Sequence, residues 1–323
     1  MGSIDDEPRH YMLGSWRGQG VEPMILAHLG GGEGWVVWSW TLDPLLLAAL
    51  AGTAAAWVLA VGSINAAHPG SPVAAWRSAA FIGGLLAILV ALQSPIDTFA
   101  DDLFSVHMLQ HLVLSFVAAP LLVLAGPMLI VLRLAGASTR RGVLLPLLRS
   151  RAVRIVTFPG LTWGLFVAVM WVAHFSPLFE LALESEAVHQ AEHALFLGSA
   201  FLYWLPAIGS EPLPWRLGWS GRLLYLLLGM PLSTVLGMLI VAQTSVLYRA
   251  YLSADAAAAL ADQRLAGAVM WVGGDLISVA LIGVLVVQWL RTERRRVRRR
   301  AEQRSLSPAP AREPATTSSS ARS

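Results

Sequence analysis

The chain alternates between long, uninterrupted apolar stretches and short polar segments. A helix needs about 20 apolar residues to cross the roughly 30 Å hydrocarbon core of a bilayer. Stretches of this length occur at residues 42–62, 78–96, 106–132, 153–174, 188–209, 221–245 and 265–290. Strands of an outer-membrane barrel would instead appear as segments of about 10 residues with alternating polarity. The pattern therefore predicts an all-α, polytopic membrane helix bundle with about seven transmembrane helices.

The composition agrees with a membrane protein and excludes a soluble enzyme. Of the 323 residues, 56% are hydrophobic and 13% are charged, whereas soluble domains carry about 25% charged residues. The sequence contains no cysteine, so neither a disulfide nor a thiolate metal ligand is available. No phosphate-binding glycine loop with lysine and no plausible Ser/His/Asp set is present, and we expect no enzymatic activity.

The distribution of charge predicts the orientation of the bundle. Arginines cluster in the segment 133–154, in the loop after the fifth predicted span and in the segment 291–300. Acidic residues instead follow the second and fourth spans, for example Asp97 and Glu180. Because short arginine-rich loops stay in the cytoplasm, we expect the N-terminus outside and the C-terminus inside.

Three regions follow from this topology. Residues 1–35 are polar and glycine-rich and are predicted to form an extracytoplasmic flexible tail. Residues 36–290 form the seven-span membrane domain, and residues 291–323 form a cytoplasmic tail that is first basic and then disordered. The basic part is interpreted as a topology determinant that lies against anionic lipid headgroups, with no role in nucleic-acid binding.

Histidines gather at one end of the predicted spans. They are His107 and His111 at the start of the third span, His174 at the end of the fourth, and His189 and His193 at the start of the fifth. Because the fourth span runs opposite to its neighbours, all five lie at the outer membrane boundary. The i, i+4 spacing of each pair places both rings on one helix face, where they can bind one metal ion.

Other side chains at this depth extend the predicted site. Met108 and Glu192 lie three residues from His111 and His189, respectively, and Met270 lies about two turns into the seventh span. Imidazole and thioether ligands without cysteine favour copper, followed by zinc, with haem iron between two histidines as the alternative. We expect the metal ligands to be His107, His111, His174, His189, His193, Met108 and Met270. Asp97, Glu192, Asp262 and Asp275 are expected to orient these ligands or to relay protons or the metal.

Several motifs resemble the CtaG family of cytochrome c oxidase assembly factors. They are SPID at 94–97, HMLQH at 107–111, AAPLLVLAGP at 118–127, HFSPLFE at 174–180, HQAEH at 189–193 and DQRLAGAVMW at 262–271. The resemblance covers about residues 36–290 in the order typical of the family. It implies a multi-pass protein of a prokaryotic plasma membrane that is needed to assemble haem–copper oxidase.

The resemblance and the histidines together suggest a function. We expect copper to be held transiently at the outer face and passed to oxidase subunits, after arriving from an extracytoplasmic copper donor. Two alternatives remain open at the level of sequence. One is a haem-binding membrane protein for electron transfer, and the other is a metal-free scaffold for oxidase subunits.

Overall fold

The computed structural model describes residues 39–252 and 255–306. Of the residues described, 83% are helical and none lies in a strand. The predicted N-terminal tail and residues 307–323 of the predicted C-terminal tail lie outside these ranges. The helical membrane fold predicted from the sequence is confirmed.

Helical segments occupy all seven predicted spans. They are α2 (Pro44–Ala67), α3 (Ala75–Gln93), the series α5 (Phe104–Val113), η2 (Leu114–Ala118), α6 (Ala119–Ala125) and α7 (Pro127–Leu134), then α11 (Pro159–Phe175), α13 (Glu186–Ile208), α14 (Trp219–Val241), and the series α15 (Ala256–Ala268), η5 (Val269–Gly273) and α16 (Gly274–Leu306). The turns η2 and η5 are π-helical.

Short helices connect these segments. They are α4 (Pro95–Ala100), α8 (Ala137–Thr139), η3 (Arg140–Leu144), α9 (Leu145–Leu148), α10 (Arg151–Val156), α12 (Leu178–Glu184) and the 3₁₀ turn η4 (Arg249–Tyr251).

Five of the described helical segments are long and apolar enough to cross a membrane, or six if the bent pair α11 and α12 forms one span. The helix that falls outside this set is α13, whose first two turns carry Glu186, His189, Glu192 and His193. These polar side chains lower the mean hydropathy of α13. Both the number of seven spans and the orientation therefore stay predictions.

Two helix starts differ from the predicted boundaries because of local chemistry. The fourth span begins at Pro159, several residues late, because the proline forces Phe158 into an extended conformation and separates α10 from α11. The last span begins early, at Ala256, because the carboxylate of Asp255 accepts hydrogen bonds from the N–H groups of Ala257 and Ala258.

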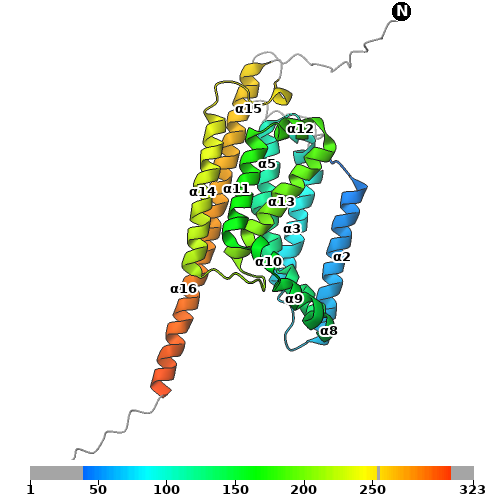
Figure 1. Ribbon diagram of the computed structural model, residues 1–323. Coiled ribbons are helices and arrows are strands. Elements are labelled where there is room, and N and C mark those ends of the chain that lie inside the picture. The colour runs from blue at the N-terminus through cyan, green and yellow to red at the C-terminus, as the bar shows by residue number, and fades with distance from the viewer. Residues whose placement is uncertain (1–38, 253–254, 307–323) are drawn as a thin grey trace, which may run out of the picture. The chain divides into compact units, whose positions relative to one another are not determined.

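Most of the described chain, up to Ser278, forms one compact unit. Within it α3 packs on α6, α11 on α13, and α15 on both α14 and α5 (Figure 1). In Figure 1, α2 lies at the edge of this unit, where the ring of Trp57 stacks on Phe81 of α3 at 4.0 Å between centroids. Of the helices that carry the five histidines, α11 packs on α13, and α13 packs on the turn η2 that continues α5.

The second unit begins at Val279 and contains the rest of α16. The arginine-rich segment 291–300 belongs to this helix, which continues to Leu306 without a break at the predicted boundary 290/291. Exposed ion pairs occur along this helix, for example the i, i+4 pair between Nε of Arg298 and Oε1 of Glu302, which lie 3.0 Å apart. The division into three regions stays a prediction.

Candidate metal centre

The centre of the site is a cluster of three buried ligand side chains. The Nε2 atoms of His107 and His111 on α5 lie 3.1 Å apart. Glu192 on α13 approaches them, with its Oε2 atom 4.0 Å from Nε2 of His107. One ligand atom from each of the three residues lies within 4.8 Å of the other two. The predicted i, i+4 pair thus faces a carboxylate from a neighbouring helix.

Tyr251 in η4 determines which nitrogen of His107 carries the proton. Its hydroxyl donates to the carbonyl oxygen of Ala100 at 2.9 Å and lies 3.1 Å from Nδ1 of His107. Because the single hydroxyl proton is already donated, Nδ1–H of His107 donates to the tyrosine oxygen. The Nε2 atom of His107 therefore keeps its lone pair and directs it toward His111.

The second pair, His189 and His193, lies beside this cluster. Ring centroids of His107 and His189 are 5.2 Å apart, and those of His111 and His193 are 5.5 Å apart. Nε2 of His189 is buried without a hydrogen-bond partner. This pair is close enough to supply further ligands after small side-chain movements.

Gln110 links His193 to Asp97. Its amide nitrogen donates to the carbonyl of Ala91 at 3.0 Å and to Oδ1 of Asp97 at 2.9 Å. Its amide oxygen therefore faces Nε2 of His193, 3.1 Å away, and accepts a hydrogen bond from its N–H. Burial raises the pKa of Asp97, while hydrogen bonds from Thr41 and Gln110 lower it. Asp97 thus orients a candidate ligand through Gln110, which sequence reasoning did not single out.

His174 on α11 forms a second group with methionines. Its Nδ1–H donates to the carbonyl oxygen of Met170 at 2.7 Å, so its Nε2 atom carries the lone pair, 3.2 Å from Sδ of Met108. Met108, Met170 and Met270 line one cavity together with His111 and His174. The cavity measures about 20 Å³, enough for about one water molecule.

Met170 is a candidate ligand that sequence reasoning missed. Its position four residues before His174 was a usable signal, because i, i+4 residues share a helix face. Met270 lies in the π-helical turn η5, and π-helical turns are frequent at functional sites.

The two remaining acidic candidates lie away from the metal-ligating atoms. The carboxylate of Asp262 on α15 accepts hydrogen bonds from the backbone N–H and the hydroxyl of Ser105, and so holds the first turn of α5, two residues before His107. Asp275 accepts a hydrogen bond from Thr234 at 2.8 Å, while its Oδ1 atom has no partner. Asp262 therefore positions the histidine helix, and Asp275 joins α16 to α14.

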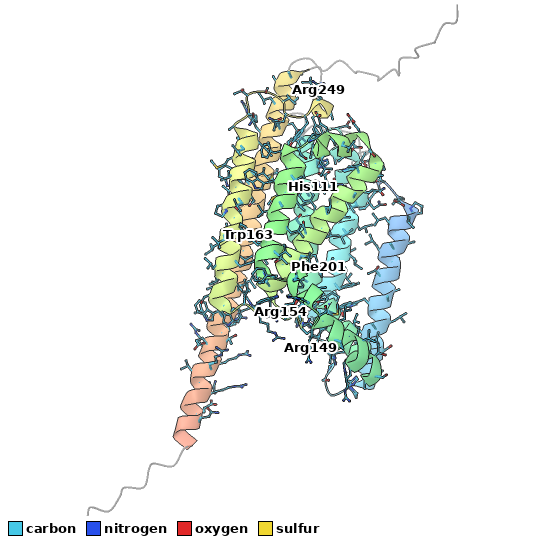
Figure 2. All side chains as sticks on the ribbon, in the orientation of Figure 1. His111, Arg149, Arg154, Trp163, Phe201 and Arg249 are labelled. Atoms are coloured by element: carbon cyan, nitrogen blue, oxygen red, sulfur yellow. The ribbon has the colours of Figure 1, made fainter. Side chains whose placement is uncertain are left out.

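Figure 2 shows where the cluster lies along the bundle. His111 lies toward the end where Arg249 is located, whereas Arg149 and Arg154 lie at the opposite end. The exposed acidic residues Asp101 and Asp102 immediately precede α5 in the chain. The candidate metal centre and the arginine-rich connection are therefore at different ends of the compact unit.

A first prediction concerns the hydroxyl group that orients His107. Replacing Tyr251 with phenylalanine is expected to lower the affinity of the centre for a metal ion by about 10- to 100-fold, the usual effect of removing a group that orients a ligand. The affinity is measured by titrating the purified protein with copper under reducing conditions. Tyr225→Phe is the matched control, because it removes a buried hydroxyl that contacts Thr162 and Tyr203 instead. Equal affinities for the two variants would contradict this role of Tyr251.

Comparisons with known proteins identify similar sequences. The model of the family described as cytochrome c oxidase caa3 assembly factor (Caa3_CtaG) matches residues 55–292. Uncharacterized proteins of Mycobacterium bovis and Mycobacterium tuberculosis are each 30% identical over 266 residues, covering 79% of this chain and 40% of theirs. A Mycobacterium leprae protein is 30% identical over 246 residues, covering 72% of this chain and 37% of its own. The chain thus spans well under half the length of these relatives, and no solved structure matches it.

Proposed function

Because the chain belongs to the cytochrome c oxidase caa3 assembly factor family, we propose that it binds copper at the His107–His111–Glu192 cluster and delivers it to a haem–copper oxidase during assembly. Copper is then the cargo of the protein. The membrane fold and the family support a role in oxidase assembly. The cluster supports the proposal that the delivered cargo is copper.

The observation that carries the proposal is a set of buried polar atoms without partners. Both carboxylate oxygens of Glu192 and Nδ1 of His111 are buried and accept or donate no hydrogen bond. A buried carboxylate without a partner costs several kcal/mol unless a cation or proton compensates it. A cation between His107, His111 and Glu192 would neutralise this carboxylate.

The spacing of the two imidazoles also fits one ion. Imidazole nitrogens bind such metals at about 2 Å, so two nitrogens on one tetrahedral ion lie about 3.3 Å apart. The observed Nε2–Nε2 distance of 3.1 Å requires little movement. When the ion binds Nε2 of His111, the proton of that nitrogen moves to Nδ1, which has no hydrogen-bond partner.

The methionines favour copper over zinc. Thioether sulfur binds Cu(I) well and contributes little to zinc sites. Met108, Met170 and Met270 line the cavity beside His111 and His174, so Cu(I) can exchange imidazole ligands for thioethers within the same region. Ligands that exchange in this way suit a protein that releases its ion to a partner.

The packing gives less support to the haem alternative. The cavity beside the histidines has a volume of about 20 Å³, and the tilted ring of Phe196 contacts His111 with 4.1 Å between ring centroids. A porphyrin would have to displace these helices, whereas a copper ion requires only side-chain movement.

The test of the proposed function uses Glu192→Gln, which keeps the shape of the side chain and removes its charge. We expect this variant to bind copper at least tenfold more weakly than wild type. Removing a group that only orients a ligand already lowers metal affinity by about 10- to 100-fold. Without metal, the variant is expected to melt at a higher temperature than wild type, since burial penalises an ionisable carboxylate more than an amide. Copper content of the purified protein and its melting temperature with and without copper are the measurements.

The control for this test is Glu184→Gln, which makes the same change at an exposed position on α12. It is expected to change neither copper content nor melting temperature. Unchanged copper content in Glu192→Gln would show that the carboxylate does not bind copper. Bound iron in wild-type protein would favour the haem alternative, and the absence of any metal would favour the scaffold.

A further inference from the structure

A second cavity lies far from the metal centre, at the arginine-rich end of the compact unit. It is a groove of about 550 Å³ lined by Arg151, Arg154, Ile155, Phe158, Leu161 and Trp215. Figure 2 places Arg154 at the end of the bundle opposite His111. The groove brings together α10, the start of α11 and the loop between α13 and α14.

Trp215 gives the groove a defined shape. Its indole nitrogen donates to the backbone carbonyl of Arg154 at 2.7 Å, and its ring meets Phe158 edge to face at 5.2 Å between centroids. The guanidinium of Arg154 lies over the same indole ring, 5.3 Å from its centroid. Residues about 60 positions apart in the chain thus form one wall, with a cation held at its rim.

The positive charge of the groove is uncompensated. Among the described residues, neither Arg151 nor Arg154 lies within 4.0 Å of a carboxylate. The sequence contains no aspartate or glutamate between Asp102 and Glu180. Glu211, on the loop that carries Trp215, already accepts hydrogen bonds from the N–H groups of Met128 and Leu129. The groove therefore offers two guanidinium groups without a carboxylate partner, which suit the oxygens of a phosphate.

The rest of the groove is apolar and continues along the outside of a helix. Ile155, Phe158 and Leu161 are 44–55% exposed, and Leu165, one turn further along α11, is 40% exposed. An exposed apolar row of this kind on a membrane helix faces acyl chains. The cationic rim and the apolar row together match a molecule with a phosphate headgroup and a hydrocarbon chain.

We propose that this groove is a binding site for an anionic phospholipid, with the phosphate on Arg151 and Arg154 and an acyl chain along Ile155, Phe158, Leu161 and Leu165. Basic pockets at the ends of transmembrane helices recognise anionic headgroups in this way. The site agrees with the expectation that the arginine-rich segments face the cytoplasm, where anionic lipid attracts them. It is independent of copper binding at the other end of the bundle.

The test measures lipid preference of the full chain. The protein is reconstituted in vesicles of equal parts phosphatidylglycerol and phosphatidylcholine, extracted mildly, and its bound lipids are quantified. Wild type is expected to retain phosphatidylglycerol preferentially. Each arginine beside an anionic headgroup contributes about a fivefold preference at low salt, so Arg151→Gln with Arg154→Gln is expected to lower the preference by about 25-fold.

The matched control is the pair Arg140→Gln and Arg141→Gln, which removes the same charge from the same connection outside the groove. It is expected to keep most of the preference. Equal losses in both double variants would overturn the proposal, because the preference would then reflect overall charge. Retention of phosphatidylglycerol in the groove variant would overturn it as well, and so would displacement of the bound lipid by inorganic phosphate alone, because the acyl chain would then contribute nothing.

Discussion

Replacing both His107 and His111 with alanine is expected to lower copper affinity by more than 100-fold and to abolish near-stoichiometric copper in the purified protein. The reason is geometric, because their Nε2 atoms, 3.1 Å apart, are the nearest pair of candidate nitrogens in the cluster. Loss of a group that merely orients a ligand already lowers metal affinity by about 10- to 100-fold, and loss of the ligands themselves is expected to lower it further. In cells, oxidase activity is expected to fall with the copper content of the membranes.

The control for this prediction is His68→Ala, because His68 is exposed and lies just after α2, away from the cluster. Wild type and the control are compared with the double variant by elemental analysis after exposure to copper under reducing conditions. Helical content and elution volume establish that the double variant is folded. Intact oxidase activity and copper content in a folded double variant would refute the copper-delivery proposal.

Replacing Gly267 with alanine is expected to destabilise the protein by about 2 kcal/mol, the usual cost of overpacking a tight contact. A methyl group at Gly267 would lie 2.7 Å from the carbonyl oxygen of Gly237 and 2.8 Å from a methyl of Val241. Because the first of these is a backbone atom of α14, it cannot rotate away. The two helices would have to separate, and small residues are what allow membrane helices to approach so closely.

The measurement is thermal unfolding in detergent, with Gly164→Ala as the matched control. A methyl group at Gly164 meets nothing within 4 Å, so this change is expected to leave the melting temperature unchanged or to raise it. Copper affinity is expected to fall in Gly267→Ala, because α15 also carries Asp262, which holds the first turn of α5 through Ser105. A melting temperature equal to that of the control would show that the close contact between α14 and α15 does not contribute to stability.

The sequence was most informative where chemistry depends on local spacing. The i, i+4 pairs His107/His111 and His189/His193 needed only helical periodicity to be placed on one face each. The opposite direction of successive spans was enough to bring His174 to the same depth. Long apolar runs were likewise enough to predict the helical membrane fold.

Partners across helices were not predictable in the same way. Glu192 was expected to orient ligands or to relay protons or the metal, and only the structure shows its carboxylate beside the imidazoles of both His107 and His111. Met170 was missed, although its spacing from His174 places both on one face of α11; only the structure shows that Met108 and Met270 line the same cavity. Asp275 was expected to orient ligands or to relay protons or the metal, and its hydrogen bond with Thr234 of α14 was not predicted.

By itself, the sequence determined the helical membrane class, the approximate position of each helix, the gathering of histidines at one end and the resemblance to the oxidase assembly family. These properties follow from hydrophobicity, helical periodicity and motif spacing, which are local along the chain. Only the tertiary structure decided which nitrogens face each other, which carboxylate approaches them and where the arginine-lined groove lies. These depend on the rotation and separation of helices far apart in sequence, set by close contacts such as that between Gly237 and Gly267.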